Sequence, residues 1–547
     1  MKSVLETCQP RPELLQGTFN PEIFTASLGP IVNHYRGGHS SVDTIYTNAE
    51  LFFKEATYPT QGLKSALSEV FGRIAGDMTV PAIHRLETAF GGGKTHTLIA
   101  CTHIAFRGKD LASVTAGLLD PALLPDPGSV AVVGVAGDEI PVHKPKGEAL
   151  VPYTLWGEIA YQIGGEELYR EVAEEAQSHA APGRTYFEKV LGDRKVLLML
   201  DELAQYAARL EAARPDGASQ LAAFLMALHG YARNHPGIAI VLTLASAADA
   251  FARQTERLTK LVSQVRGEEI SPDEAISLGN EAVRSVASVV SRDAVQITPV
   301  QGAEISAVLA KRLFTAVDRD AARETADAYL EMYRRNSADL PTAATSHGYG
   351  DRMVANYPFH PTLIDYLNQK LATAENFQGT RGVLRVLSLV VRSIWESKVD
   401  VPMIHACHFD LRSSRVADEL LGRTGSSDLL PILNADVGGV DTDGLEGGKS
   451  NAQLADEANP HPEGYPLYEY TWKTVFLHSL VGRELGLGSN IFGLTESDAL
   501  FAVAFPGMTP AQVRMALEEI PKRAYYLKYE QGRYFASDTP TLNSVLA

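Results

Sequence analysis

Short apolar runs alternate with longer stretches of helical periodicity through residues 81–300. After a first strand that begins at Ile83, β-branched runs follow at 129–135 (SVAVVGV), 195–202 (KVLLMLDE) and 238–244 (IAIVLTL), with a weaker run at 294–298 (AVQIT). Continuous apolar strands are typical of a parallel sheet covered on both faces. Strands that alternate with helices in this way predict a doubly wound α/β core.

The rest of the chain divides by pattern into further parts. Beyond Gln301 the apolar positions repeat with helical spacing, which predicts a helical lid domain. Gly, Asp and Asn then crowd a stretch typical of a linker or mobile loop. Last come helices and two aromatic-rich strands joined by Glu530-Gln531-Gly532, which predict a winged-helix-like module. The predicted parts are an N-terminal helical and mixed segment at 1–80, the core at 81–300, the lid at 301–425, the linker at 426–465 and the module at 466–547.

Residues 249–291, between the fourth and fifth runs, form a polar, helix-favouring segment that is longer than ordinary connections. A pore-like or substrate-facing insertion fits this segment. A long helical hairpin fits it equally well, and the sequence leaves the two open.

The stretch IHRLETAFGGGKTHTLIA, residues 83–100, places a glycine-rich turn between the first apolar strand and a helix. Backbone N–H groups of such a turn cradle phosphate oxygens, a following lysine reaches the terminal phosphates, and a threonine hydroxyl holds Mg²⁺. The usual phosphate-loop spacing has glycine where this chain has Thr88, so the match is not literal. A flexible glycine-rich surface loop is the alternative, but it does not require the flanking strand and helix. The residues predicted to bind nucleotide are Ala89, Phe90, Gly91, Gly92, Gly93, Lys94, Thr95 and His96, with Thr95 also a Mg²⁺ ligand.

A turn at Tyr58-Pro59-Thr60 precedes this strand. Proline pins the turn, and the flat ring of Tyr58 could line an adenine site. Alternatively, Thr60 simply caps the following helix and no ligand is involved.

Two acids, Asp201 and Glu202, end the third apolar run. An acid at the carboxyl end of a buried strand organises Mg²⁺, and a second one activates water as general base, so we assign these roles to Asp201 and Glu202 respectively. Capping of the next helix is the alternative.

Thr243 is a polar residue at the end of the fourth apolar run and a candidate sensor of the terminal phosphate. Ser246, shortly after it, is a second candidate. A purely structural role for Thr243 is as plausible, because threonine is a good strand former.

Charge on a transferred phosphoryl group calls for a cation beyond the lysine. Arg292 precedes the fifth run, where an arginine finger acting on a neighbouring subunit would lie, which implies a homo-oligomer. Arg381 and Arg385 lie one helical turn apart in the lid and could reach the nucleotide. For any one of these arginines, an ordinary solvated position is the favoured alternative.

Composition narrows the class of protein. Lys and Arg total 49 against 66 Asp and Glu, a net charge of −17, which argues against a surface that coats nucleic acid. Neither a membrane-spanning stretch nor a signal peptide is apparent, and three scattered cysteines fit a reducing compartment, so we expect a cytoplasmic protein with no membrane partner. His405, Cys407 and His408 match no common zinc spacing and are interpreted as packing.

The assembled motifs resemble a family of prokaryotic P-loop ATPases related to AAA+ proteins, with the signature LET-x-FGGGKTH. The matching segments fall between about residues 52 and 390, and they are FFKEATYPTQGL, HRLETAFGGGKTHTLIA, LLMLDELAQYA, YPFHPTLIDYL and FQGTRGVLRVL. The family was long catalogued as a domain of unknown function. The resemblance implies ATP and Mg²⁺ as cofactors and tolerance of Thr88. It also implies a place in phage-defence or restriction-type gene clusters, often beside an adenine-specific DNA methyltransferase, with similar large ATPases in BREX systems.

The first hypothesis is therefore an ATP hydrolase that couples turnover to conformational change on DNA or a partner protein. A nucleotide-dependent binding switch with little hydrolysis is the second. From Ala511 onward, five basic residues oppose four acids, a weak footprint for DNA that fits a protein partner equally well; Arg523 and Arg533 are the basic residues we would test. A kinase or other transferase is less attractive, since no acceptor motif is found.

Overall fold

The chain forms two compact units in a computed structural model. The sheet unit is Thr25–Gln301, and the helical unit combines Met1–Phe24 with Gly302–Ala547. This division lies next to the boundary predicted at residue 300. The structure describes residues 1–20, 27–39, 41–87, 93–147, 149–244, 255–374, 377, 380–442 and 448–546.

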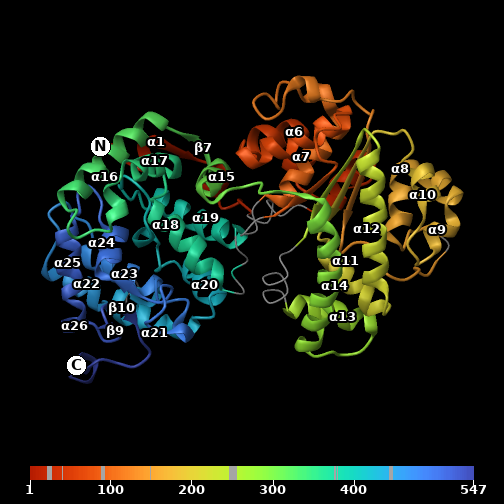
Figure 1. Cartoon of the computed structure of the whole chain (residues 1–547). Helices are drawn as coiled ribbons and strands as arrows, with labels where there is room; N and C mark the ends of the chain where they lie inside the picture. The colour runs from red at the N-terminus through yellow and green to blue at the C-terminus, as the bar shows by residue number, and fades with distance from the viewer. Residues whose placement is uncertain are drawn as a thin grey trace. The chain divides into compact units, whose positions relative to one another are not determined.

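A five-stranded parallel sheet is the centre of the sheet unit (Figure 1). Its order is β3-β4-β5-β2-β6, and every neighbouring pair is parallel. All the strands predicted from the apolar runs are present, so the α/β prediction is confirmed. Their bounds are β2 (Ile83–Leu86), β3 (Ala131–Ala136), β4 (Val196–Asp201), β5 (Ile238–Thr243) and β6 (Val295–Ile297).

Side chains of each strand alternate between two helix-covered faces. On β4, Leu198 and Leu200 belong to the hydrophobic core that includes α11, α12 and α14. Met199 faces the other way and accepts a hydrogen bond from Thr102 of α7 (Lys94–Arg107) at 3.7 Å. Asp201 follows the same alternation as Met199. It therefore lies on the α7 face of the sheet.

The helices of the sheet unit cover both faces of the sheet. Figure 1 shows α11, α12 and α14 side by side, and α13 packs on α11 and α14. For its described part, the segment left open at 249–291 is thus a helical hairpin, α13–α14, packed on neighbouring helices. The bounds are α3 (Leu28–Tyr35), α4 (Thr44–Thr47), α5 (Ala49–Leu51), α6 (Gln61–Ala75), α7, α8 (Leu155–Glu171), α9 (Ala173–Gln177), α10 (Arg184–Val190), α11 (Leu203–Ala213), α12 (Gly217–Asn234), α13 (Thr255–Arg266) and α14 (Pro272–Asp293).

The helical unit is built around α23, whose residues are all buried. Its other α-helices and strands are α1 (Val4–Thr7), β1 (Cys8–Pro10), α2 (Pro12–Gln16), α15 (Ile305–Leu313), β7 (Phe314–Val317), α16 (Arg319–Arg335), α17 (His347–Asn356), α18 (Pro361–Asp365), α19 (Thr380–Glu396), α20 (Ser414–Arg423), α21 (Leu430–Ile432), α22 (Asn451–Ala458), α23 (Leu467–Leu477), β8 (Leu494–Thr495), α24 (Glu496–Val503), α25 (Pro510–Glu518), α26 (Ile520–Arg523), β9 (Leu527–Glu530), β10 (Arg533–Ala536) and α27 (Leu542–Leu546). In the described parts of both units, each helix is too short or too polar to cross a bilayer.

The N-terminal segment differs from the single part predicted at 1–80. Strand β1 pairs antiparallel with β7, so the first residues belong to the helical unit. Such pairing joins residues about 300 positions apart, and sequence periodicity carries no signal for it.

The linker predicted at 426–465 is also different, since its described residues are packed into the helical unit. Its polar residues bind backbone groups internally. Asp436 is fully buried and accepts hydrogen bonds from the amides of Tyr525 (2.7 Å), Tyr526 (2.6 Å) and Leu527 (2.9 Å) and from the Asn451 side chain (2.8 Å).

Asp456 has a similar role at the start of α23. Its two oxygens accept the amide protons of Tyr468 (2.8 Å) and Glu469 (3.0 Å), which lie in the first turn of the helix. First-turn amides have no partner within a helix, so this carboxylate satisfies them. Polar composition alone could not separate such internal ligands from a solvated linker.

The predicted C-terminal hairpin is present. Strands β9 and β10 pair antiparallel, and the sheet order is β8-β10-β9. Gln531 (φ 50°) and Gly532 (φ 77°) are both left-handed, as a two-residue type I′ turn requires.

Replacing Asp436 tests this packing. We expect Asp436→Ala to lower the free energy of unfolding of the helical unit by about 3 kcal/mol, because buried amides lose a charged acceptor. Asp436→Asn should lose less, and Asp538→Ala, at an exposed position, should change little. Urea denaturation followed by circular dichroism measures the difference; equal stability of Asp436→Ala and Asp538→Ala would contradict the assignment.

Candidate active site

Four polar residues meet where β4 and β5 end, beside the start of α7. Leu200 pairs with Leu242, so the next residues, Asp201 and Thr243, stand level on neighbouring strands. Both point to the α7 face, where Thr95 lies in the first helical turn. Parallel strands bring their carboxyl ends to one edge, which is why residues far apart in sequence converge here.

A continuous hydrogen-bond network joins these side chains. The Thr95 hydroxyl donates to Oδ2 of Asp201 at 3.0 Å, and the Thr243 hydroxyl donates to Oδ1 at 2.7 Å. The amide of Glu202 donates to Oγ1 of Thr243 at 2.8 Å and to Oδ1 of Asp201 at 3.1 Å. Asp201 and Thr243 are buried, so neither relies on water for its partners.

Glu202 has an unusual backbone conformation. Its φ of 52° and ψ of 39° are left-handed, and it is the N-cap residue of α11. For a non-glycine residue this conformation costs about 1–2 kcal/mol, so surrounding contacts must maintain it. Gly137 is one such contact: a Cβ at this position would lie 2.2 Å from the Glu202 carbonyl oxygen.

The loop after β3 contributes charge near the network. Arg209 donates to the carbonyl of Gly137 at 2.9 Å, and Asp138 opposes the fall in the Arg209 pKa that burial causes. Burial also raises the pKa of Glu139, reinforced by nearby acids and countered by a hydrogen bond from Ser27. No site residue was predicted in this loop, although a Gly-Asp pair, residues 137 and 138, directly follows the strand and is a signal for it.

The start of α7 has the geometry of an anion site. Gly93 is left-handed (φ 90°), and Lys94 and Thr95 begin α7. The first amides of a helix have no partner within it and can bind an anion. A Cβ on Gly93 would lie 2.8 Å from the Val300 side chain, so glycine is required on steric grounds as well. The predicted phosphate-binding residues Ala89, Phe90, Gly91 and Gly92, like Thr88, lie outside the described residues.

The turn that contains Tyr58 is held by hydrogen bonds of the threonines on either side of it, Thr57 and Thr60. Thr60 caps α6 by accepting from Leu63 at 3.1 Å, as the alternative interpretation predicted, and its hydroxyl donates to the carbonyl of Pro299 at 2.6 Å. Thr57 donates to Phe52 at 2.8 Å, so its oxygen accepts from Nε2 of His96 at 3.0 Å. His96 is therefore a contact between α7 and this turn, and Tyr58 lies half-buried between the two anchors.

Arg292 does not join the network in its own chain. Arg292 is exposed in the last turn of α14, at the edge where the strands begin, opposite the network. Arg385 belongs to the helical unit, where it pairs with Glu419 at 2.8 Å. The Arg381 side chain and Ser246 lie outside what the structure describes.

The donor set suits Mg²⁺ held together with a phosphate. The Thr95 hydroxyl can donate to Asp201 while its lone pairs remain available to a cation, and Asp201 supplies carboxylate oxygen. Within the described residues, no group of three or more His, Cys, Asp or Glu could hold a metal. Mg²⁺ usually completes its shell with waters and substrate phosphates, so two protein ligands are sufficient.

Family comparisons cover most of the chain. Residues 26–267 match the model described as the DUF499 N-terminal domain, and residues 301–535 match the DUF499 second domain. The chain belongs to the DUF499 family. The family-level resemblance is confirmed, whereas the ATPase activity it implies stays a prediction. The second DUF499 match begins at residue 301, next to the point where the two units divide. No curated protein and no solved structure matches the chain.

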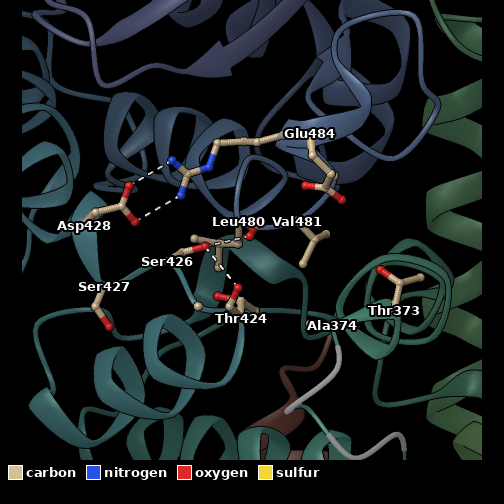
Figure 2. A pocket seen from close by; sticks show the side chains of 12 residues that line it. Thr373, Ala374, Thr424, Ser426, Ser427, Asp428, Leu480, Val481 and Glu484 are labelled. Carbon is tan, nitrogen blue, oxygen red and sulfur yellow. Dashed lines mark hydrogen bonds and ion pairs between the residues drawn. The ribbon is translucent and has the colours of Figure 1, made fainter. Parts of the chain in front are cut away.

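A separate hollow of about 620 Å³ lies in the DUF499 second domain (Figure 2). Arg483 pairs there with both oxygens of Asp428, at 3.0 and 3.2 Å, and Ser426 donates to the carbonyl of Leu480 at 2.7 Å. Arg483 and Asp428 therefore neutralise each other, and we assign the hollow no ligand. The lining residues are Thr373, Ala374, Thr424, Gly425, Ser426, Ser427, Asp428, Leu480, Val481, Gly482, Arg483 and Glu484.

Buried histidines in the same domain are packing residues, as interpreted from sequence. His405 donates from Nδ1 to the carbonyl of Ala502 and accepts at Nε2 from Tyr329, both at 2.8 Å. It stacks on His360 at 4.2 Å between ring centroids, and His408 accepts from its amide at 2.9 Å. Burial lowers the pKa of His405 to about 4, against the hydrogen bond to the Ala502 carbonyl, which raises it.

This histidine makes the DUF499 chain sensitive to acid. Its folded pKa of about 4 is below the unfolded value near 6.5, so its contribution to stability is complete above pH 6.5 and is lost as the pH falls toward 4. We expect His405 to contribute a slope of about 1.4 kcal/mol per pH unit within that window. Urea unfolding at stepped pH measures the slope; His405→Gln should reduce it, and His39→Gln, at an exposed position, should not. Equal slopes in His405→Gln and wild type would refute this account.

Proposed function

We propose that this protein binds and hydrolyses ATP with Mg²⁺ and couples turnover to conformational change on a partner. The observation that carries the proposal is the network of Thr95, Asp201 and Thr243 beside the N-terminus of α7. It places a hydroxyl, a buried carboxylate and an adjacent acid at the helix end that favours phosphate.

Each residue has a distinct role in this proposal. Lys94 and the amides of the α7 N-terminus bind the terminal phosphates. Thr95 and Asp201 would hold Mg²⁺, whose charge would stabilise the developing charge on the phosphoryl oxygens. Glu202 takes the proton from the attacking water as general base.

Sheet topology supports the same location. Neighbouring strands β2 and β5 are followed by connections that run in opposite directions, to β3 and to β6. Such a switch point opens a crevice at the carboxyl ends of the strands, where α/β proteins bind ligands. The proline-pinned turn before β2 adds Tyr58 as the lip of the adenine site, and its half-buried, doubly anchored position suits that role.

For the partner, the observations favour protein over DNA. Arg523 pairs with Glu519 at 2.9 Å, and Arg533 donates to the carbonyl of Phe492 at 2.9 Å, so both test residues have internal roles. Met515 and Tyr529 are instead exposed, at 45% and 46%. The order of helices and strands in the C-terminal module suits a winged-helix-like fold that docks a protein.

Arg514 adds to this argument because it lies on α25, where such a fold would present its recognition helix. It is neutralised by Asp339 and Glu496, both at 2.7 Å. A nucleotide-dependent switch that recruits a protein with little hydrolysis is therefore the second candidate. On the strength of the family resemblance, we propose that either function serves a phage-defence or DNA-modification complex.

Glu202→Gln tests the hydrolysis directly. We expect kcat to fall by about 10²–10⁴-fold, because the general base is lost, while ATP still binds. Glu174→Gln, at an exposed position on α9, is the matched control and should retain wild-type turnover. Unchanged turnover in Glu202→Gln would remove this residue from the reaction, and turnover absent from wild type would favour the switch.

A mixing experiment tests whether Arg292 completes a neighbouring site. Arg292→Ala and Glu202→Gln should each lose turnover, because each removes one half of a site shared between subunits. A mixture of the two variants should recover part of the turnover, because some interfaces of the mixed oligomer join an intact Arg292 to an intact Glu202. Arg284→Ala, exposed on the same helix, should stay active alone. Failure of the mixture to recover, with both variants folded, would contradict an arginine finger in trans.

A further inference from the structure

Thr243 has little hydrogen-bonding capacity left for a ligand. A threonine hydroxyl has one proton and two lone pairs. The proton goes to Oδ1 of Asp201 at 2.7 Å, and one lone pair accepts the Glu202 amide at 2.8 Å. The side chain is 2% exposed, so water has almost no access to it.

We propose that Thr243 is a positioning residue: it holds Glu202 in its left-handed conformation and fixes the Asp201 carboxylate, and it does not sense the terminal phosphate. This inference rests on the proposed ATP hydrolysis. It also replaces the sensing role that position at a strand end predicted.

Donation to a phosphate would weaken the hydrogen bonding inside the site. If the Thr243 proton turned toward a phosphoryl oxygen, Oδ1 of Asp201 would lose its bond at 2.7 Å and keep the longer one from the Glu202 amide, at 3.1 Å. Weakening the hydrogen bonds of a buried carboxylate is costly. The phosphate would have to compensate for that loss before gaining any affinity.

The left-handed backbone of Glu202 supplies the second argument. This conformation is unfavourable for a residue with a side chain, and at Glu202 the amide is held by Thr243 and Asp201. Gly137 packs against the carbonyl of the same residue. Removing the Thr243 hydroxyl takes away the shorter bond of the amide, at 2.8 Å, and keeps the longer one to Asp201, at 3.1 Å, so the carboxylate of Glu202 is less well oriented.

The network also connects the proposed Mg²⁺ ligands to the proposed general base. Hydrogen bonds run from Thr95 on α7 through Asp201 on β4 and Thr243 on β5 to the Glu202 amide at the start of α11. Displacement of Thr95 when Mg²⁺ and phosphate bind would thus be transmitted to the general base. A positioning residue in this chain should affect Mg²⁺ dependence and kcat together.

The test is a graded series at one position: Thr243→Ser keeps the hydroxyl, Thr243→Cys weakens it, and Thr243→Val removes it at nearly constant shape. We expect kcat to fall about 10–100-fold in Thr243→Val, and the Mg²⁺ concentration that gives half-maximal turnover to rise. Both quantities should change less in Thr243→Cys and stay near wild type in Thr243→Ser. The ratio of Kd for ATP and ADP, titrated without Mg²⁺, should stay within about twofold of wild type, because positioning adds no contact to the terminal phosphate. A tenfold change in that ratio with unchanged Mg²⁺ dependence would establish sensing and overturn the proposal.

Hydrogen exchange gives a readout that does not need turnover. In the full chain, a peptide spanning residues 200–206 should exchange faster in Thr243→Val than in wild type, with Thr243→Ser unchanged. Equal exchange in Thr243→Val and wild type would overturn the positioning role even if ATP is hydrolysed. Faster exchange in a chain that neither binds nor hydrolyses ATP would leave positioning intact and reject the proposed function instead.

Discussion

The Asp201 carboxylate is the group on which the site depends. It is buried at the end of β4, and each of its oxygens accepts a hydroxyl proton, from Thr95 on one side and Thr243 on the other. An ionised group in such a position is tolerated only when it is fully hydrogen-bonded. The sheet satisfies that requirement by bringing β5 and α7 to the same edge. Lys94 and Glu202, the chain neighbours of Thr95 and Asp201, are thereby brought to that edge as well.

Internal carboxylates serve the helical unit in a comparable way. Asp436 gathers three backbone amides and a side-chain amide, and Asp456 satisfies the first turn of the buried helix α23. Both acids come from a stretch whose Gly, Asp and Asn content is typical of a linker. Composition measures polarity, whereas the partners of these carboxylates are residues 12 to 91 positions away.

Much of the sheet unit was predictable because its signals are local. Apolar runs mark the strands, Gly93-Lys94-Thr95 marks the start of α7, and Asp201 follows directly from the end of an apolar run. The register of β4 against β5 is not a local property, so the proximity of Thr243 to Asp201 was foreseeable only in outline. Neither the direction in which the Thr243 hydroxyl donates nor the left-handed backbone of Glu202 could be predicted from the sequence.

Charge was the least predictable property. Arg523 and Arg533 were plausible DNA contacts by sequence, but their partners in the structure are Glu519 and a backbone carbonyl. Arg385 likewise pairs with Glu419. An arginine in a sequence shows only available charge, because long side chains find partners from other elements after folding.

Calorimetric titration of ATP with and without Mg²⁺ shows whether Asp201 and Thr95 form a Mg²⁺-nucleotide site. Wild type should bind ATP more tightly when Mg²⁺ is present, and Asp201→Asn should lose that enhancement while keeping Mg²⁺-free binding through Lys94. Absence of ATP binding by wild type, or the same Mg²⁺ enhancement in Asp201→Asn, would contradict the account.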